Sequence, residues 1–270
     1  MGLTKKQISR LKYTDGGILV NGREVYVTEI LHPGDLVDAD AGSVPAEGHS
    51  IRPSSLPLTI LYEDEDIIAL NKPAGVSSHP AGIHQEDTIV NRLVYHFREN
   101  GEPVIPHPVG RLDISTSGVI CFAKNRTALA RLIKQRERKL LYKEYTAVVS
   151  GHFGNRCGEI ELPLRRDPAN ALRVIVSEDG KYAKTVYEVI GETEEVSLVN
   201  LRILTGRMHQ IRVHMAATGH PLLGDQLYGG CTDRIARAAL HAGKMVLYRP
   251  FSDEKLELAA PLPEDMRKLL

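Results

Sequence analysis

Cysteine is scarce in this chain of 270 residues, and its three cysteines show no paired spacing. Zinc sites built from cysteine need closely spaced pairs, and disulfide frameworks need an even set. The pattern therefore argues against a structural zinc site and is consistent with a reducing cytoplasm. The three residues are Cys121, Cys157 and Cys231.

Long hydrophobic runs are also missing. The longest, such as residues 119–123, are far too short to cross a bilayer. No charged-then-apolar leader opens the sequence, which argues against secretion. Charged residues make up 25% and apolar residues 42%, a globular balance that allows one large or two modest domains. We therefore expect a cytoplasmic protein with no membrane partner.

Neither sign of charge is in excess, because 34 basic residues balance 34 acidic ones. Zero net charge alone argues against a non-specific nucleic-acid binder, but the basic residues are clustered and such clusters bind polyanions. The alternative, that residues 126–139 form a solvated helix face, stays open. The clusters are Lys5, Lys6, Arg10 and Lys12, and then Lys124, Arg126, Arg131, Lys134, Arg136, Arg138, Lys139 and Lys143.

Turn signals and composition divide the chain into three parts. Residues 1–45 combine a short helical pattern with strand-like segments around Asn21-Gly22 and other turns, which indicates a small α+β module. Residues 46–57 lie in a segment rich in Gly, Ser and Pro, which is typical of a linker. Residues 58–270 form a longer unit of mixed type.

The longer unit contains more strand patterns than helix patterns. Helices are predicted over residues 86–100, 126–139 and 206–219, and residues 118–125 read as a buried strand. Strand patterns often follow one another directly, which favours antiparallel pairing over a doubly wound parallel sheet. We expect an α+β fold with a mixed, largely antiparallel central sheet and flanking helices.

Asp113 stands at the entrance to the buried strand, in the sequence "GRLDISTSG". In an extended stretch Arg111 shares its face, so the guanidinium would hold the carboxylate ionised or bind a nearby phosphate. Three hydroxyl residues follow, and Gly118 permits a tight turn. The alternative is an ordinary Asx turn leading into a strand.

A second cluster lies in "LTGRMHQIRVHMAATGHPLLGD". On a helix, Arg212 points towards the side that Ile211 and Met215 help to bury, and a buried arginine needs an anionic partner. Asp113 is the natural candidate. Histidines at 209, 214 and 220 are spaced five and six apart, unlike the i, i+4 pair of a metal site, so no metal is expected.

Tyr145 in "YKEYTAVVSG" is the third candidate. It is either a core tyrosine, a stacking platform for a base, or a proton acceptor whose surroundings lower its pKa from roughly 10. The sequence contains no glycine-rich phosphate cradle, and no Ser-His-Asp or Cys-His arrangement can be singled out.

Taken together, these segments resemble the motifs of the RluA family of pseudouridine synthases. The resemblance covers residues 58–270 and is carried by "ILYEDEDIIALNKPAGVSSHP", "GRLDISTSGVICFAKN", "YKEYTAVVSG", "GKYAKTVYEV" and "LTGRMHQIRVHMAATGHPLLGDQLYGG", with the ending "LHAGKMVLYRP…LELAAPLPEDM". The segment "SRLKYTDGGILVNGREV…ILHPGDLVDAD" is similar to the later part of the small RNA-binding module called S-four-like. Its usual opening helix is short or missing here.

The resemblance implies a role for each matched residue. Asp113 falls on the essential aspartate, Tyr145 on the tyrosine that packs on the target base, and Arg212 on the basic partner of the aspartate. Arg111 helps to hold the target nucleotide out of the helix, and Leu112 and Ile211 line the pocket. One departure is Gly110, where the family usually has histidine. Further expected RNA contacts are Arg207, His209, Lys143, Lys124, Lys5, Lys6 and Arg10.

The implied activity is isomerisation of uridine to pseudouridine in structured RNA, without cofactor or metal, by a monomeric enzyme. The N-terminal module favours ribosomal over transfer RNA as the partner. One alternative is a non-catalytic RNA-binding or ribosome-assembly factor on the same fold. Another is a hydrolase with Asp113 as a lone nucleophile, although the second carboxylate expected there does not stand out.

Overall fold

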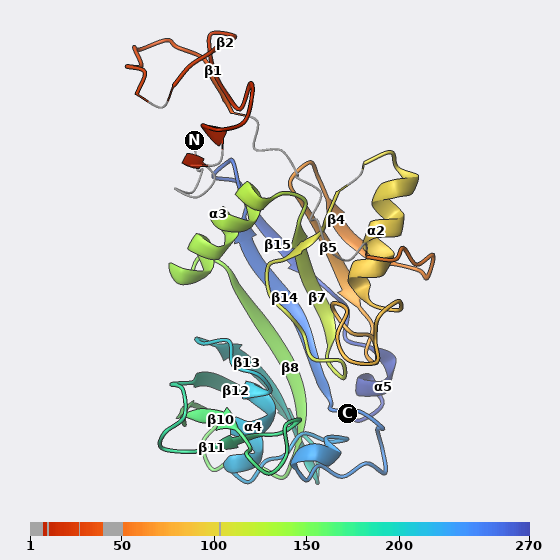
Figure 1. Cartoon of the computed structure of the whole chain (residues 1–270). Helices are drawn as coiled ribbons and strands as arrows, with labels where there is room; N and C mark the ends of the chain where they lie inside the picture. The colour runs from red at the N-terminus through yellow and green to blue at the C-terminus, as the bar shows by residue number, and fades with distance from the viewer. Residues whose placement is uncertain (1–7, 10, 27, 40–50, 103) are drawn as a thin grey trace.

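The N-terminal segment forms a small sheet of its own in the computed structural model, which describes residues 8–9, 11–26, 28–39, 51–102 and 104–270 (Figure 1). Its three strands are ordered β2-β1-β3. Asn21 and Gly22 have φ of 51° and 77°, as a two-residue hairpin turn requires. Lys5, Lys6 and Arg10 lie outside the described residues. The strands are β1 (Ile18–Val20), β2 (Arg23–Glu24) and β3 (Val37–Ala39).

A ten-stranded sheet forms the body of the molecule, in the order β4-β5-β7-β14-β8-β13-β12-β9, with β15 beside β14 and β6 beside β7. Within the described residues, β7 and β14 make its one parallel pair. The largely antiparallel α+β fold is therefore confirmed. The strands are β4 (Ile60–Glu63), β5 (Ile67–Lys72), β6 (His107–Pro108), β7 (Ser117–Ala123), β8 (Tyr142–Ser150), β9 (Cys157–Glu161), β12 (Lys184–Glu192), β13 (Val196–Ile203), β14 (Leu240–Tyr248) and β15 (Lys255–Ala259).

Both faces of this sheet are covered, which explains why all seven residues of β7 are buried. Alternate residues of β5 face opposite sides: Ile68 packs in the apolar cluster that includes α2 and α4, and Ile67 packs in the cluster that includes α3. No helix in the described part of the chain is long and apolar enough to cross a membrane. The helices are α2 (Ile89–Glu99), α3 (Arg126–Glu137), α4 (Gln210–Ala217), the 3-10 turn η1 (Gln226–Tyr228) and α5 (Glu264–Arg267).

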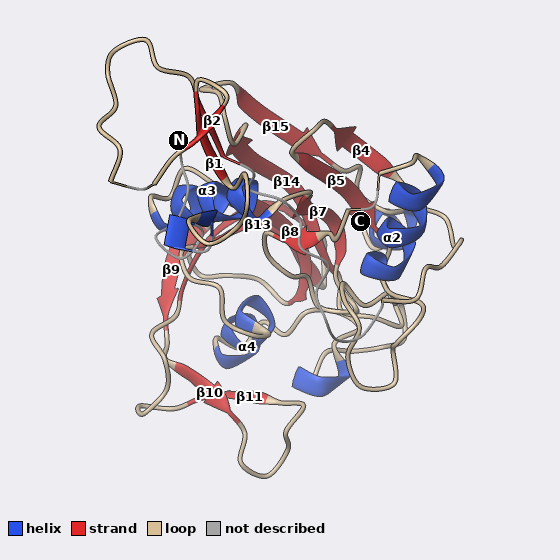
Figure 2. Ribbon diagram, turned by 45° about the horizontal axis from the view of Figure 1, so that its top comes forward, coloured by secondary structure: helices blue, strands red, loops and turns tan. Residues whose placement is uncertain are grey.

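Helix α4 begins later than its sequence pattern predicts. The Gln210 side chain accepts hydrogen bonds from the Arg207 backbone N–H (3.1 Å) and the Thr205 hydroxyl (2.7 Å), which shapes residues 205–209 as a loop. The helix closes as expected at Gly219, whose φ is +85°. Figure 2 shows α4 between the main sheet and a hairpin that the sequence did not predict, β10 (Leu164–Arg166) and β11 (Val174–Val176).

The second half of the predicted linker is attached to the main domain. The backbone N–H of Ser54 donates to the carbonyl of Asn91 (3.1 Å), and the Asn91 amide donates to the carbonyl of Arg52 (2.7 Å). Arg92 also donates to the carbonyl of Pro57 (3.0 Å). Residues 51–57 are therefore held along α2, while residues 40–50 lie outside the described part of the chain.

Candidate active site

Asp113 lies in a loop whose backbone is anchored at successive residues. The carbonyl of Leu112 accepts a hydrogen bond from the Ser78 hydroxyl (3.0 Å), and the carbonyl of Asp113 accepts one from the Thr116 N–H (3.1 Å). The carbonyl of Ile114 accepts from the backbone N–H of Gly75 (2.8 Å). Because the backbone is fixed on both sides of Asp113, its side chain is presented from a rigid turn.

Two basic side chains, the buried Lys72 and the partly buried Arg237, also hold this loop. The ammonium of Lys72, which is fully buried, donates to the carbonyls of Pro73, Val76 and Ile114. Arg237 donates to the carbonyl of Ser115 (3.2 Å). Burial lowers the pKa of Lys72 to about 7, and the negative charge of Asp113 opposes this shift.

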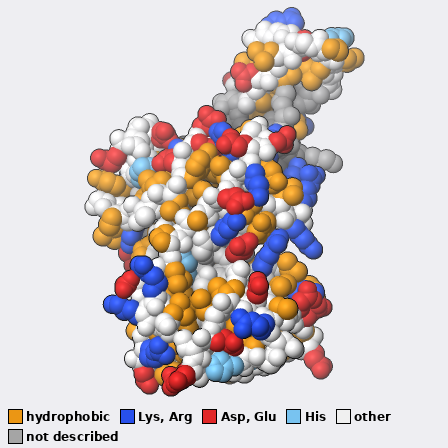
Figure 3. Space-filling model, turned by 180° about the vertical axis from the view of Figure 1, so that it is seen from behind, with side chains coloured by type: hydrophobic (Ala, Val, Ile, Leu, Met, Phe, Trp, Pro, Cys, Tyr) orange, Lys and Arg blue, Asp and Glu red, His pale blue; other side chains and the backbone are white. Residues whose placement is uncertain are grey.

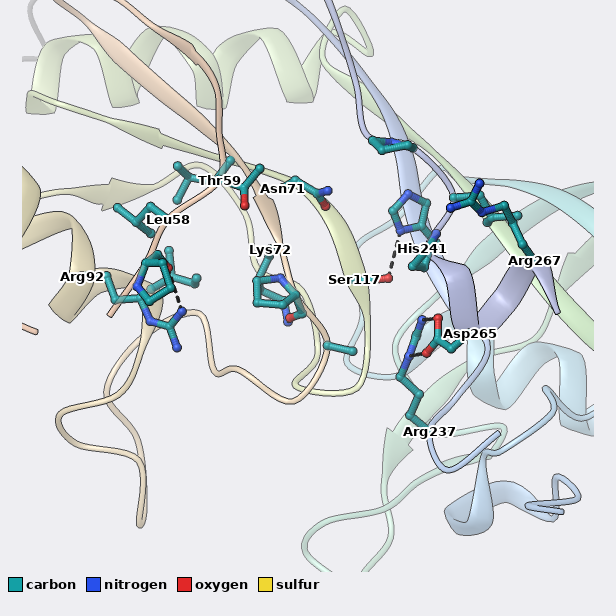
Figure 4. A pocket seen from close by; sticks show the side chains of 18 residues that line it. Leu58, Thr59, Asn71, Lys72, Arg92, Ser117, Arg237, His241, Asp265 and Arg267 are labelled. Carbon is teal, nitrogen blue, oxygen red and sulfur yellow. Dashed lines mark hydrogen bonds and ion pairs between the residues drawn. The ribbon is translucent and has the colours of Figure 1, made fainter. Parts of the chain in front are cut away.

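Lys72 and Arg237 also line a cleft of about 440 Å³ (Figure 4). The cleft is polar, and several of its charged and imidazole side chains are engaged within the protein. Arg237 pairs with Asp265 (2.6 Å), and His241 contacts Ser117 (2.9 Å) and a backbone carbonyl (3.1 Å). We therefore interpret this cleft as the support of the Asp113 loop and not as the substrate site.

Gly118 fixes the point at which this loop enters β7. Its φ is +111°, and a Cβ at this position would lie 2.2 Å from the carbonyl oxygen of Ala242 in the parallel strand β14. Only glycine permits both this backbone conformation and this close approach of the two strands. The position of Asp113 therefore depends on the contact between β7 and β14.

The Asp113 carboxylate is partly open to solvent, with 28% of its side chain exposed. Nη1 of Arg212 lies 3.7 Å from its Oδ2, and Nε2 of His209 lies 3.9 Å from the same oxygen. Among the described residues, Arg212 and His209 are the basic side chains that lie within 4.0 Å of the Asp113 carboxylate. The Arg111 side chain lies farther away. The exposed Arg111 is therefore available to RNA, the second of the two roles predicted for it.

The expected pairing of Arg212 with Asp113 needs a correction. Arg212 is 8% exposed, as the helix pattern predicts, but its close partner is Asp225, which is 2% exposed. Nε and Nη2 of Arg212 each donate to an oxygen of Asp225 at 2.7 Å, a bidentate pair that offsets the burial of both charges. Asp113 is a second, looser neighbour of the same guanidinium.

Tyr145 is 6% exposed and packs in one apolar cluster with Leu112 and Ile211. We call these three residues the apolar wall; Leu112 and Ile211 are the two to which the resemblance assigns the lining of the pocket. Burial raises the pKa of Tyr145, and the nearby Asp113 carboxylate raises it further. Of the three alternatives for Tyr145, the proton acceptor with a lowered pKa is therefore not supported, and the phenol is neutral at physiological pH.

The other predicted RNA contacts are dispersed. Arg207 is exposed, and its Nε donates to the carbonyl of Tyr182 (2.9 Å). Lys143 lies beside the Asp113 loop: its Nζ would be 4.0 Å from a Cβ added at Gly110. Burial lowers the pKa of Lys143 to about 8. A side chain at position 110 would therefore project towards this ammonium.

The position of Lys124 in the structure does not support its predicted role as an RNA contact. It is 7% exposed, and its Nζ pairs with Glu63 (2.8 Å) and Glu102 (3.0 Å). Two carboxylates therefore neutralise this cation inside the domain. A similar mixing of charges is visible in Figure 3, where Lys and Arg side chains are interspersed with Asp and Glu over the face in view.

The three histidines of the α4 region have separate surroundings. His214 is buried and contacts the Thr185 hydroxyl (2.9 Å), whereas the His220 ring stacks on Phe153 with centroids 3.8 Å apart. His209 faces Asp113 instead. Across the residues that the structure describes, no group of three His, Cys, Asp or Glu side chains is arranged to hold a metal.

Known proteins share this fold and these motifs. The model of the RNA pseudouridylate synthase family matches residues 66–217. A solved structure, human RNA pseudouridylate synthase domain containing 1, is 28% identical with a TM-score of 0.63, over 80% of this chain and 86% of that one. The fold is therefore that of an RNA pseudouridylate synthase.

Two bacterial relatives extend the similarity. The uncharacterized RNA pseudouridine synthase YhcT of Bacillus subtilis is 42% identical over 93% of this chain and 83% of its own length. Ribosomal large subunit pseudouridine synthase D of Escherichia coli K12 is 36% identical over 81% of this chain and 71% of its own. The chain belongs to the RNA pseudouridine synthase family, within its RluA group, and is an isomerase that acts on RNA.

Proposed function

We propose that this enzyme converts uridine to pseudouridine in ribosomal RNA, with Asp113 as the reacting carboxylate. The observation that carries the proposal is the setting of Asp113. Its side chain is 28% exposed on an anchored loop, faces the Arg212 guanidinium and adjoins the apolar wall that contains Tyr145. A carboxylate in this position is open to a substrate and is carried by an anchored backbone.

The reaction breaks the bond between ribose C1′ and uracil N1, turns the base, and rejoins it to C1′ through C5. The proton leaves C5 and N1 gains one, so atoms balance and no redox partner or group donor is needed. Asp113 acts as a nucleophile or as a base at the ribose. Because Asp225 is bound to Arg212 and the Tyr145 phenol is neutral, Asp113 is also the group we assign to proton transfer from C5.

The neighbouring residues bind and orient the nucleotide in this proposal. Tyr145 stacks on the uracil, with Leu112 and Ile211 beside it. A uridine must leave its stack to enter such a site, which costs a few kcal/mol. Phosphate contacts of exposed Arg111 and Arg207 offset that cost.

Ribosomal RNA is favoured over transfer RNA by two observations. The Escherichia coli relative is named for the large ribosomal subunit. We assign residues 1–45 to an S-four-like module that a linker joins to the catalytic domain of residues 58–270. The strands that the structure describes between residues 18 and 39 form the sheet β2-β1-β3. We place the enzyme in the cytoplasm and expect it to act as a monomer without a cofactor.

The activity is tested by release of tritium from RNA labelled at uracil C5. Large-subunit ribosomal, small-subunit ribosomal and transfer RNA are each transcribed with the label and incubated with the protein. We expect release from the large-subunit transcript with wild-type protein and none with Asp113→Asn. Equal release by both proteins would remove Asp113 from the mechanism, and release from transfer RNA alone would overturn the ribosomal assignment.

The modified position is found by a carbodiimide-based pseudouridine map of total RNA from cells with and without the gene. The expected result is the loss of one or more signals in ribosomal RNA. Complementation with Asp113→Asn provides the matched control, because it should bind RNA but restore no signal. Restoration of the signals by this variant would favour a non-catalytic role.

A further inference from the structure

His209 adopts an uncommon backbone conformation beside the Asp113 carboxylate. At the start of α4 it has φ of 53° and ψ of 19°, in the left-handed region that few residues other than glycine occupy. Its side chain is 15% exposed, and its Nε2 lies 3.9 Å from Oδ2 of Asp113. The backbone conformation thus places an imidazole at the reacting group.

The hydrogen bonds of Tyr228 favour one of the two neutral tautomers of His209. The backbone N–H of Val174, in the β10–β11 hairpin, donates to the Tyr228 hydroxyl oxygen at 2.9 Å. The same hydroxyl lies 2.9 Å from Nδ1 of His209. Because a backbone N–H can only donate, the hydroxyl proton is free to point at Nδ1. The neutral ring is then protonated on Nε2, the nitrogen that faces Asp113.

The surroundings of His209 favour this neutral form. Burial lowers its pKa, Arg212 on the next turn of α4 lowers it further, and the carboxylates of Asp113 and Asp225 oppose the shift. Tyr228 is a further titratable neighbour, and its hydroxyl lies 2.9 Å from Nδ1 of the ring. A neutral donor can orient Asp113 without adding a second positive charge, whereas an imidazolium beside Arg212 would make the carboxylate a weaker nucleophile.

We propose that His209 is a positioning residue for the reaction: its neutral imidazole, fixed by Tyr228, donates from Nε2 to the Asp113 carboxylate and holds that carboxylate in its reactive direction. The proposal rests on the synthase function proposed above. A hydrogen bond of about 2.9 Å requires an approach of roughly 1 Å, well within the motion of two side chains. Tyr228 and the Val174 N–H act indirectly, through the ring.

The first test compares two amide replacements of His209 by single-turnover tritium release. His209→Gln keeps an N–H near the place of Nε2, whereas the shorter amide of His209→Asn reaches only the place of Nδ1. Asparagine also tolerates the left-handed backbone, so this variant is expected to fold. We expect the single-turnover rate constant at saturating protein to fall about 10- to 100-fold in His209→Asn, with RNA affinity unchanged, and clearly less in His209→Gln.

The second test is the pH profile, which a purely structural residue would not change. In wild-type protein, kcat should fall as the pH decreases through the pKa of His209, which lies below its ordinary value of 6.5. The glutamine of His209→Gln cannot titrate, so this fall of kcat at low pH, the acid limb of the profile, should disappear. Tyr228→Phe removes the hydroxyl proton that stabilises the neutral ring, so the limb should move to higher pH.

Two results would overturn the proposal: wild-type rates in both His209 variants, or an acid limb that persists unchanged in His209→Gln. Circular dichroism and thermal unfolding of each variant control for folding, and the pH profile of His209→Gln remains decisive should His209→Asn fail to fold. Failure of the wild-type protein to release tritium from any RNA would overturn the proposed function itself, and with it this role.

Discussion

Arg212 donates two hydrogen bonds of 2.7 Å to Asp225, and its third nitrogen, Nη1, lies 3.7 Å from Oδ2 of Asp113. One guanidinium therefore contacts two carboxylates, and its contact with Asp225 is the closer one. The bidentate pair fixes its plane, and the free edge places a positive charge at the reacting group. Because Asp225 already neutralises most of that charge, Asp113 is oriented without being held in a tight ion pair.

The first prediction concerns Asp225→Asn. Loss of this carboxylate leaves the buried Arg212 without its counter-charge, so the free energy of unfolding should fall by about 3 kcal/mol, measured by urea denaturation. Arg212 should then pair with Asp113, and misdirection of that carboxylate should reduce single-turnover tritium release by about 100-fold. Asp113→Asn is the matched control, because it should abolish release while changing stability by less than about 1 kcal/mol. Equal stability of the two variants would contradict the argument.

The second prediction concerns Tyr145 and alkaline pH. Burial and the Asp113 charge raise the pKa of this phenol, so the phenolate is not populated at neutral or mildly alkaline pH. A mechanism that used the phenolate as a base would become faster with rising pH, because deprotonation would increase the active fraction. We therefore expect wild-type protein and Tyr145→Phe to show the same pH dependence of the single-turnover rate between about pH 7 and 9. A tenfold rise per pH unit that is lost in Tyr145→Phe would contradict the neutral phenol.

Local sequence patterns predicted the parts of this molecule that local chemistry controls. The apolar spacing of residues 89, 90, 93, 94 and 97 gave helix α2, and the apolar run after Gly118 gave the buried strand β7. Asp113 could be singled out because its neighbours formed a recognisable loop. These features depend on residues a few positions apart.

Contacts between distant segments were not predictable in the same way. The sequence analysis assigned no role to Asp225, and the packing of η1 against α4 brings it to Arg212. Lys124 seemed part of a basic stripe because its partner Glu63 lies in the acidic segment "YEDEDI", far away in the sequence. Basic and acidic residues that lie in separate segments of the sequence, such as Lys124 and Glu63, can therefore form ion pairs in the folded protein.

The third prediction separates a true RNA contact from this internal pair. Arg111 is exposed, whereas Lys124 is 7% exposed and bound to two carboxylates. Arg111→Gln should weaken RNA binding and reduce the slope of log K against log salt by about 1, since one phosphate contact is lost. Lys124→Met should leave the slope unchanged. A filter-binding titration at several salt concentrations measures both, and equal slopes for the two variants would contradict the assignment.

The fourth prediction uses Gly118, on which the approach of β7 to β14 depends. Gly118→Ala places a methyl group 2.2 Å from the carbonyl oxygen of Ala242 and forces a φ of +111° on alanine. Backbone strain and overpacking together should lower the free energy of unfolding by about 3 kcal/mol or more. The displaced Asp113 loop should also slow tritium release. The natural control is Gly219→Ala, at a φ of +85° in open space, which should cost about 1 kcal/mol and leave the rate unchanged. If both alanines cost the same, close packing of the two strands is not what fixes the loop.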